Sequence, residues 1–462
     1  MKNKDFNFAF LLKITIVSAM GGLLFGYDLM VIGGAKPFYE RFFDIALSAN
    51  LQAWVMSSAL IGCIAGALAS GFVSDRYGRK KALLCAALIF TVSSIGIGLA
   101  GNITLFVSFR ILGGMGIGLA SALSPMYIAE IAPSHIRGRF VSLNQMTIVI
   151  GILLAQIVNL LIAENVPEGA SDRFIAASWN GRMGWRWMFW ACGVPSVLFF
   201  LFVFFIPESP RWLLKVGKAE GAYPVLEKIG GKLYAKQEVE SIQASLKEAG
   251  QKVDFKALLN PVYGLVLMIG VVMAVFQQWC GINTVFYYAE EIFAEAGYGV
   301  SDTLFNIVIT GSVNLIFTFV AMFTVDKWGR KKLLLFGACG LALDYILLGS
   351  AFFFHLQGIA VLVLVLTAIA IFAMSLGPIV WVILSEIFPN RIRGAAMALA
   401  TFALWVGCFV LTYTFPLLNK SLGAAATFWV YSGVCILGFL FIAVKLPETK
   451  GKSLEEIENT LR

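Results

Sequence analysis

The sequence predicts an all-α polytopic membrane protein, with twelve transmembrane helices arranged as two parallel six-helix repeats. Hydrophobic residues make up 59% of the chain and charged residues only 13%, whereas soluble domains have about 25% charged residues. Twelve apolar runs of about 20 residues follow one another, and each is long enough to cross a bilayer as a helix. Three polar motifs also recur, in the same order, in the two halves of the chain.

Short polar connections separate the apolar runs, except after the sixth run. There a longer connection rich in Lys, Glu and Ala covers residues 207–258, and we expect it to form short amphipathic helices on the cytoplasmic face. The first run is too long for a signal peptide and lacks a clear cleavage site, so we expect it to remain as the first helix. The predicted spans lie near residues 10–33, 51–74, 82–100, 103–130, 141–163, 185–206, 260–289, 301–324, 333–354, 358–386, 395–418 and 425–446.

The distribution of the net charge of +8 argues against nucleic acid as a partner and for a membrane. Lys and Arg gather in alternate connections, whereas the connections between them carry few charges or acidic ones, such as Glu290, Glu291 and Glu295. This positive-inside pattern places both termini in the cytoplasm. The seven cysteines all lie inside apolar runs without the spacing of metal ligands, so we expect neither a metal site nor a disulfide.

The repeated motifs divide the chain into two equivalent halves. Residues 74–81 correspond to 325–332, residues 130–138 to 386–394, and residues 207–211 to 447–450, at separations of 240 to 256 residues. An even number of helices in each repeat preserves its orientation, so a solute site is expected between the halves at mid-depth. The predicted divisions are a first half over 1–206, a linker over 207–258, a second half over 259–446 and a cytoplasmic tail over 447–462.

The motifs place acidic and basic side chains together at the cytoplasmic ends of the helices. One interpretation is solvated charge that signals topology and contributes little per pair. The other is a breakable network that latches the halves together on the inside and so favours an outward-open state. The residues of this predicted cytoplasmic gate are Asp75, Arg76, Arg79, Glu130, Arg137, Asp326, Arg330, Glu386 and Arg393.

Two opposite charges lie inside predicted spans of the first half. Asp28 is the single acid of the first span, about five residues from its outer end, and Arg110 lies about seven residues into the fourth. An ionisable residue inside a membrane is a functional hypothesis that needs a named partner, and these two have matching depth. The pair either staples the two helices or couples transport to a proton, because a carboxylate that loses its partner in a dry site takes up a proton.

The stretch from Phe276 to Tyr288 puts three amides and two phenols into an apolar run. Unpaired amides are costly without water, so they face either protein partners or a wet cavity. Gln277 and Asn283 would point about 240° apart on an ideal helix, and we expect the helix to loosen at Gly281 and bring them together. Amides beside aromatic rings suit a hydroxyl-rich solute, although amides also join helices to one another in bundles.

With these motifs in place, the chain resembles the sugar porter branch of the major facilitator superfamily, closest to bacterial D-xylose:proton symporters. The resemblance runs from Gly22 to Glu456, and the ordered set of motifs is highly specific. It rests on residues 26–28, 75–80, 137–138, 207–212, 277–283, 377–381 and 447–451, with residues 124–130 and 142–145 pointing to the symporters.

The resemblance implies a major facilitator fold in the bacterial inner membrane and a monosaccharide as substrate. It implies Asp28 as the coupling carboxylate, with the proton as the coupling ion, no other cofactor and function as a monomer. Leu404 departs from the family, which usually has an amide there, and this leaves xylose, glucose, arabinose and galactose open. The sugar site that it implies consists of Phe25, Gln145, Gln277, Gln278, Asn283, Tyr287, Asn314, Trp381 and Trp405.

Three other functions compete with proton-coupled symport by alternating access. A facilitative uniporter would have the same site, but Asp28 would never titrate. A non-transporting receptor would usually need a long signalling extension, and a drug exporter suits three clustered amides poorly. The residues offer no nucleophile or metal constellation, so we do not expect an enzyme.

Overall fold

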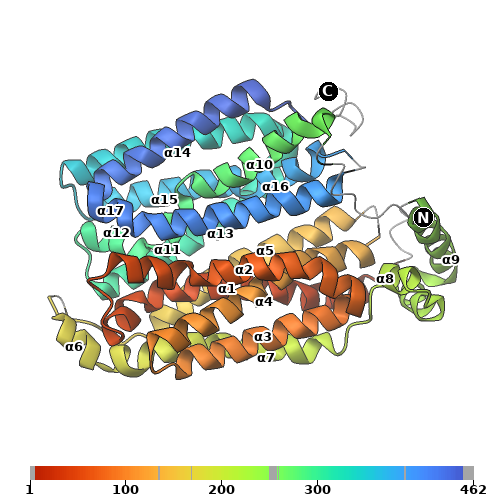
Figure 1. Ribbon diagram of the computed structural model, residues 1–462, viewed down its shortest axis with the longest axis horizontal. Helices are drawn as coiled ribbons and strands as arrows, with labels where there is room; N and C mark the ends of the chain where they lie inside the picture. The colour runs from red at the N-terminus through yellow and green to blue at the C-terminus, as the bar shows by residue number, and fades with distance from the viewer. Residues whose placement is uncertain are drawn as a thin grey trace.

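The computed structural model describes residues 6–133, 136–167, 169–248, 258, 260–389 and 392–450. Within the helices, the side chains of residues 245–248, 325–327 and 393 are not described. The described residues are almost all helical, and the helices form two groups that lie side by side (Figure 1).

The first group contains the first half of the chain. Four of its eight described helices begin at a side chain that accepts a backbone N–H, as Ser48, Asn102 and Ser171 do. Its helices are α1 (Phe8–Phe42), α2 (Ala49–Tyr77), α3 (Arg79–Leu99), α4 (Ile103–Ile131), α5 (Arg137–Ile162), α6 (Asp172–Ala177), the π-helix η2 (Asn180–Gly184) and α7 (Trp185–Val203).

Two helices follow between the groups and lie at one end of the molecule (Figure 1). Helix α8 (Pro210–Lys215) starts at the N-cap Ser209, and α9 (Ala219–Glu248) is interrupted at Gly230 and Gly231. These are the helices expected in the linker. The predicted boundaries at 206 and 258 stay predictions, and residues 249–257 lie outside the described part of the chain.

The second group contains the second half of the chain. Several of its spans are broken or bent where the first half is continuous. The helices are η4 (Pro261–Tyr263), α10 (Gly264–Trp279), α11 (Ile282–Tyr287), α12 (Ala289–Glu295), α13 (Val300–Trp328), α14 (Arg330–Phe353), α15 (Ile359–Met374), α16 (Leu376–Ile387) and α17 (Arg393–Lys445).

The described helices confirm the predicted twelve-span membrane fold. Eleven helical segments are long and apolar enough to cross a bilayer. The last of them, with 52 residues, holds two spans, because Gly423 at φ +78° bends α17 in the middle. The tenth span is also irregular, since α15 and α16 meet at Ser375.

The first span differs from its prediction. The apolar run was expected to end near residue 33, but α1 continues to Phe42 through Lys36, Pro37 and Glu40. Asp28 therefore lies 14 residues before the end of its helix (42 − 28) and not five. The extension is stable because the charges of Lys36 and Glu40 are paired inside the protein.

The two groups meet along equivalent helices. Helix α2 of the first half packs against α17, and α5 packs against α13 of the second half. We call the end that carries Asp75, Glu130 and Glu386 the motif face, and the end that carries Glu40 and Glu291 the opposite face. Helices α8 and α9 lie at the motif face, and α6 and α12 lie at the opposite face (Figure 1).

Candidate functional site

The seventh span breaks where the sequence predicted it would. Helix α10 ends at Trp279, Gly281 adopts φ +87°, and α11 starts at Ile282. A side chain larger than hydrogen is unfavourable there, because a Cβ would lie 2.9 Å from the Tyr431 side chain and the backbone is left-handed. The expected loosening of the helix at Gly281 is confirmed.

The break lets the three amides of the span form one chain of hydrogen bonds. The Nε2 of Gln277 donates to the backbone carbonyls of Leu376 (3.1 Å) and Gly377 (2.8 Å). Gln278 Nε2 donates to Gln277 Oε1 at 3.4 Å, and Asn283 Nδ2 donates to Gln278 Oε1. The continuous helix would have kept Gln277 and Asn283 apart, so the local backbone creates this cluster.

The three amides differ in accessibility and therefore in what they can do. Gln277 is 3% exposed, and its amide hydrogens bind carbonyls next to the break between α15 and α16. This is the helix-joining role that the sequence left open. Gln278 and Asn283 are only half-buried, so they retain accessible surface for a solute. The hydrogen bonds found for these amides lie within the second half.

Aromatic side chains from both halves meet beside the amides. The rings of Phe25 on α1 and Trp405 on α17 lie 5.9 Å apart. Tyr287 is buried at the end of α11, and a Cβ on Gly33 of α1 would lie 3.6 Å from its backbone oxygen. The seam between the halves is therefore closed by rings and backbone at this level.

The remaining predicted site residues lie on three other helices. Gln145 is half-buried on α5, Asn314 is buried on α13, and Trp381 is 38% exposed on α16. Helices α5 and α13 pack together across the two halves. Among the described residues, no hydrogen bond joins these three side chains to the amide cluster, and their roles toward a sugar stay predictions.

Asp28 and Arg110 form a buried ion pair. Asp28 Oδ2 lies 3.6 Å from Arg110 Nη1, and that nitrogen also donates to the backbone carbonyl of Asp28 at 3.3 Å. The side chains are 4% and 2% exposed. Neither Asp28 Oδ2 nor Arg110 Nε has a hydrogen-bond partner among the described residues. The pairing is thus loose in a dry setting, which favours neutralisation of the carboxylate by a proton once the arginine moves.

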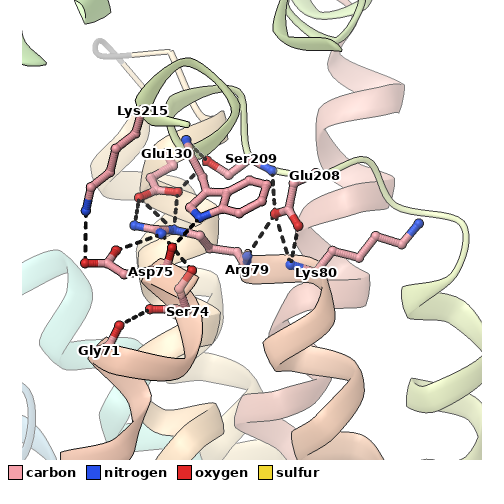
Figure 2. Close-up of polar contacts among 10 residues, drawn as sticks. Gly71, Ser74, Asp75, Arg79, Lys80, Glu130, Glu208, Ser209 and Lys215 are labelled. Atoms are coloured by element: carbon pink, nitrogen blue, oxygen red, sulfur yellow. Dashed lines mark hydrogen bonds and ion pairs between the residues drawn. The ribbon is translucent and has the colours of Figure 1, made fainter. Parts of the chain in front are cut away.

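At the motif face, the first half holds a dense polar network (Figure 2). Arg79 contacts both Glu130, at 2.8 Å, and Asp75, at 3.1 Å. The hydroxyl of Ser209 donates to Glu130, and Lys215 of α8 pairs with Asp75 at 2.9 Å. This network ties α2, α3 and α4 to the start of the linker.

The second half repeats the arginine–glutamate and hydroxyl–glutamate contacts of this network. Arg330 contacts Glu386 at 3.2 Å, and Thr449 Oγ1 donates to Glu386 Oε2 at 2.6 Å. The tail residue Thr449 thus takes the place that Ser209 has in the first half. The repeat predicted from the sequence is reproduced at the level of single contacts.

Sequence reasoning missed the role of the glutamate in each Pro-Glu motif. Glu208 accepts the backbone N–H groups of Arg79 (2.9 Å) and Lys80 (3.1 Å) at the N-terminus of α3. Glu448 does the same for Arg330 (3.0 Å) and Lys331 (3.1 Å) at the N-terminus of α14. A carboxylate suits a helix N-terminus, where the dipole is positive. The recurrence of the motif was the available signal.

The latch predicted between the halves stays a prediction. The ion pairs found among the described side chains of the motif face lie within one half or join it to α8. Arg76 stacks on Phe72 and Tyr77, and Arg137 is exposed. The side chains of Asp326 and Arg393 lie outside the described part.

Two parallel six-helix halves, a seventh span broken at mid-depth and a buried charge pair define a membrane transporter of the major facilitator superfamily. The sugar (and other) transporter family model matches residues 14–461, and the chain belongs to this family.

Known relatives and solved structures cover almost the whole chain. It is 42% identical to the D-xylose-proton symporter of Escherichia coli (strain K12), over 99% of this chain and 96% of that protein. It is 41% identical to the arabinose-proton symporter of Bacillus subtilis (strain 168), over 98% of this chain and 96% of that protein. The inward open conformation of the xylose transporter XylE from E. coli matches with a TM-score of 0.85 at 40% identity, over 97% of this chain and 99% of that chain.

Proposed function

We propose that this protein carries a monosaccharide and a proton together across the membrane by alternating access. The observation that carries the proposal is the buried pair of Asp28 and Arg110, in a chain about 40% identical to named sugar–proton symporters. In a uniporter the pair would only staple α1 to α4, whereas in a symporter the carboxylate takes up a proton when it loses its arginine in a dry site.

The substrate is a D-xylose-like pentose or a hexose. Gln278 and Asn283 supply accessible amides, and Gln277 joins them through Gln278. Phe25, Tyr287, Trp381 and Trp405 supply rings for the apolar faces of a sugar. Relatives include xylose and arabinose symporters, and Leu404 is an apolar residue at 3% exposure beside Trp405. Gln145 and Asn314 complete the proposed site from α5 and α13.

The proposed transport cycle starts at the ion pair of Asp28 and Arg110. With the opposite face open to the outside, Asp28 takes a proton and releases Arg110, and the sugar binds between the halves. The opposite face then closes, the two halves separate at the motif face, and sugar and proton leave to the cytoplasm. The proton is the coupling ion, and no other cofactor is part of the proposal.

The proposed setting is the inner membrane, with the motif face and both termini in the cytoplasm. The basic residues of the motif face, such as Arg79, Arg137 and Arg330, support this orientation. Lipid surrounds the bundle, and each chain works as a monomer because the site lies between its own two halves.

The test is sugar accumulation by proteoliposomes that hold a proton gradient. Asp28→Asn cannot titrate, so it should equilibrate sugar without concentrating it. The wild-type chain should concentrate the sugar by up to about tenfold for each pH unit of gradient. A panel of pentoses and hexoses identifies the substrate.

The same experiment decides between symport and its rivals. Undiminished accumulation by Asp28→Asn would exclude the coupling role, and equilibration without accumulation by the wild-type chain would indicate a uniporter. Sugar binding with no flux in either direction would indicate a receptor.

A further inference from the structure

A second group of buried charges lies at the opposite face, and its first member, Lys36, stands eight residues after Asp28 on α1 (36 − 28). Lys36 and Glu40 come from α1 of the first half, and Glu290 and Glu291 come from α12 of the second half. Lys36 is 1% exposed and Glu40 is 5% exposed, while Glu290 and Glu291 are 15% and 24% exposed. We call these four residues the outer cluster.

Lys36 is the centre of the outer cluster and joins the two halves. Its Nζ lies 3.3 Å from Glu40 Oε1, 3.6 Å from Glu290 Oε2, and in direct contact with Glu291 Oε1. The ammonium also faces the ring of Tyr288, 5.8 Å from the ring centre. Two of its three ion pairs therefore cross the boundary between the halves.

The outer cluster has more negative than positive charge. Three carboxylates and one ammonium give a formal charge of −2 (−3 + 1) when all are ionised. Lys36 is the only cation that pairs with these carboxylates in the described part of the chain. Gln52 of α2 donates to Glu40 Oε2 at 3.0 Å, but it brings no charge.

One buried carboxylate oxygen of the outer cluster, Glu291 Oε2, lacks a hydrogen-bond partner among the described residues. Glu40 Oε1 is also buried without a hydrogen bond, and its contact is the ion pair with Lys36 at 3.3 Å. Carboxylates that share a buried site cannot all ionise, so a proton on one of them relieves both the repulsion and an unmatched oxygen. The geometry therefore favours a bound proton.

Burial raises the pKa of Glu291 to about 8, with Lys36 opposing the rise and Glu290 and Glu40 adding to it. The other titratable groups that face it are Tyr39 of α1 and Tyr288 of its own segment. A raised acid pKa means that the closed arrangement binds a proton that an exposed glutamate, with a pKa of about 4.3, has lost at neutral pH.

We propose that the outer cluster is a second proton-binding site, which locks the two halves together at the opposite face while it holds a proton. The lock rests on the relative motion of the halves in the proposed function, but it requires neither sugar nor Asp28.

The proton of this site enters and leaves on the same side of the membrane. When the halves separate, Glu291 meets water, returns to its ordinary pKa and releases the proton to the bulk at the opposite face. The same proton is taken up from that bulk on closure. It therefore sets when the face opens, and it adds nothing to the number of protons carried with each sugar.

Closure of the opposite face should depend on pH, and a lower pH should favour it. Between pH about 4.5 and about 8 the closed state holds one more proton than the open state, so lowering the pH favours closure. The ratio of closed to open molecules should rise by up to about tenfold for each pH unit lowered within this window.

The experiment measures the distance across the opposite face by electron spin resonance, on the full chain without sugar. Spin labels at Leu47, which is 91% exposed in the connection after α1, and at the exposed Ser421 of α17 report on the two halves. The seven native cysteines are replaced first, and sugar binding confirms that this background is folded. We expect the short distance to dominate at pH 5 and the long distance to gain population toward pH 9.

Three variants separate the outer cluster from other titrating groups. Glu291→Gln mimics the protonated state and should stay closed across the whole range. Glu295→Gln is the matched control on the same helix, where Glu295 binds Asn419 within the second half, and it should behave as wild type. Asp28→Asn should keep the pH dependence of the distance even though it loses coupling.

Two results would overturn the proposal. One is a distance distribution in the wild-type chain that does not change with pH, and the other is an unchanged pH dependence in Glu291→Gln. Loss of the pH dependence in Asp28→Asn would also overturn it, by assigning the effect to the first proton site. Failure of sugar-coupled proton flux would refute the proposed function and leave this distance measurement intact.

Discussion

Gln277 shows how one side chain can stabilise a break in a neighbouring helix. Its amide donates to two carbonyls at the start of α16, where the helix has lost the continuity of α15. These carbonyls lie in the first turn of α16 and also accept N–H groups of the next turn, so Gln277 adds a second donor that joins α10 to α16. The residue therefore contributes to folding before any solute arrives.

Replacing Gln277 by alanine should lower the stability of the folded chain by about 1–3 kcal/mol, because two buried hydrogen bonds between α10 and α16 are lost. Gln278→Ala is the control, since its half-buried amide bonds only to the neighbouring amides of Gln277 and Asn283, and it should cost less than half as much. Thermal unfolding in detergent measures both. Equal midpoints for the two variants would contradict the structural role of Gln277.

Single residues also mark the limit of prediction from the sequence. The predicted first span ends before Lys36 and Glu40, because charges and Pro37 are unfavourable in lipid. Lys36 pairs with Glu40 on its own helix and with Glu290 and Glu291, which lie about 250 residues away on α12. Sequence patterns report the cost of a buried charge, but a partner on a distant element becomes visible only once the chain is folded.

At the scale of elements, the start of α3 and the start of α14 are built alike. Each follows a glycine at positive φ, Gly78 at +93° and Gly329 at +90°, and each is capped by a glutamate from a Pro-Glu motif. A Cβ on Gly78 would lie 2.2 Å from Glu208 Oε2, so the capping carboxylate needs the glycine.

Gly78→Ala should therefore destabilise the chain by about 1–3 kcal/mol through backbone strain and displacement of Glu208. Gly71→Ala is the matched control, since Gly71 lies inside α2 with nothing within 4 Å of an added Cβ. That change should be neutral or stabilising by up to about 1 kcal/mol. Unfolding midpoints of both variants check the prediction, and a stable Gly78→Ala variant would argue against the cap.

The elements were predictable where local signals were strong. The apolar runs gave the spans, and Gly281 correctly marked the break between α10 and α11. The recurrence of Pro-Glu indicated that positions 208 and 448 are equivalent. It did not indicate which backbone groups they bind, because a capping contact between distant segments leaves no periodic pattern.

At the scale of the whole molecule, the backbones of the two halves are in close contact where Gly33 of α1 faces α11. A Cβ there would lie 3.5 Å from the carbonyl oxygen of Phe286 and 3.6 Å from that of Tyr287. An alanine fits, but a longer side chain does not while this part of the seam is closed.

Gly33→Leu should hold the opposite face open, so uptake by proteoliposomes should fall at least about tenfold while sugar binding remains, because about 1.4 kcal/mol of strain already shifts an equilibrium tenfold. Gly433→Leu is the control, at a glycine of α17 with nothing within 4 Å of a Cβ. Wild-type uptake by Gly33→Leu would show that this seam need not close during transport.

The sequence could not predict which face is closed. The repeats and the charge pattern are the same in every conformation of a transporter with two equivalent halves. The similarity to an inward open structure and the ion pairs of Lys36 across the opposite face are properties of one arrangement among several. The sequence pattern identifies the helices and motifs. Only contacts in the folded chain show how the two halves are placed relative to each other.

The hydrogen bonds of Gln277 have a consequence for affinity. A ligand hydroxyl that captures this amide must take it from the carbonyls of Leu376 and Gly377, and α16 then loses a contact that holds it against α10. Binding of a sugar hydroxyl by Gln277 and release of α16 from α10 would then occur together. Part of the intrinsic binding energy would be converted into movement, and the apparent affinity would be weaker than the contacts alone suggest.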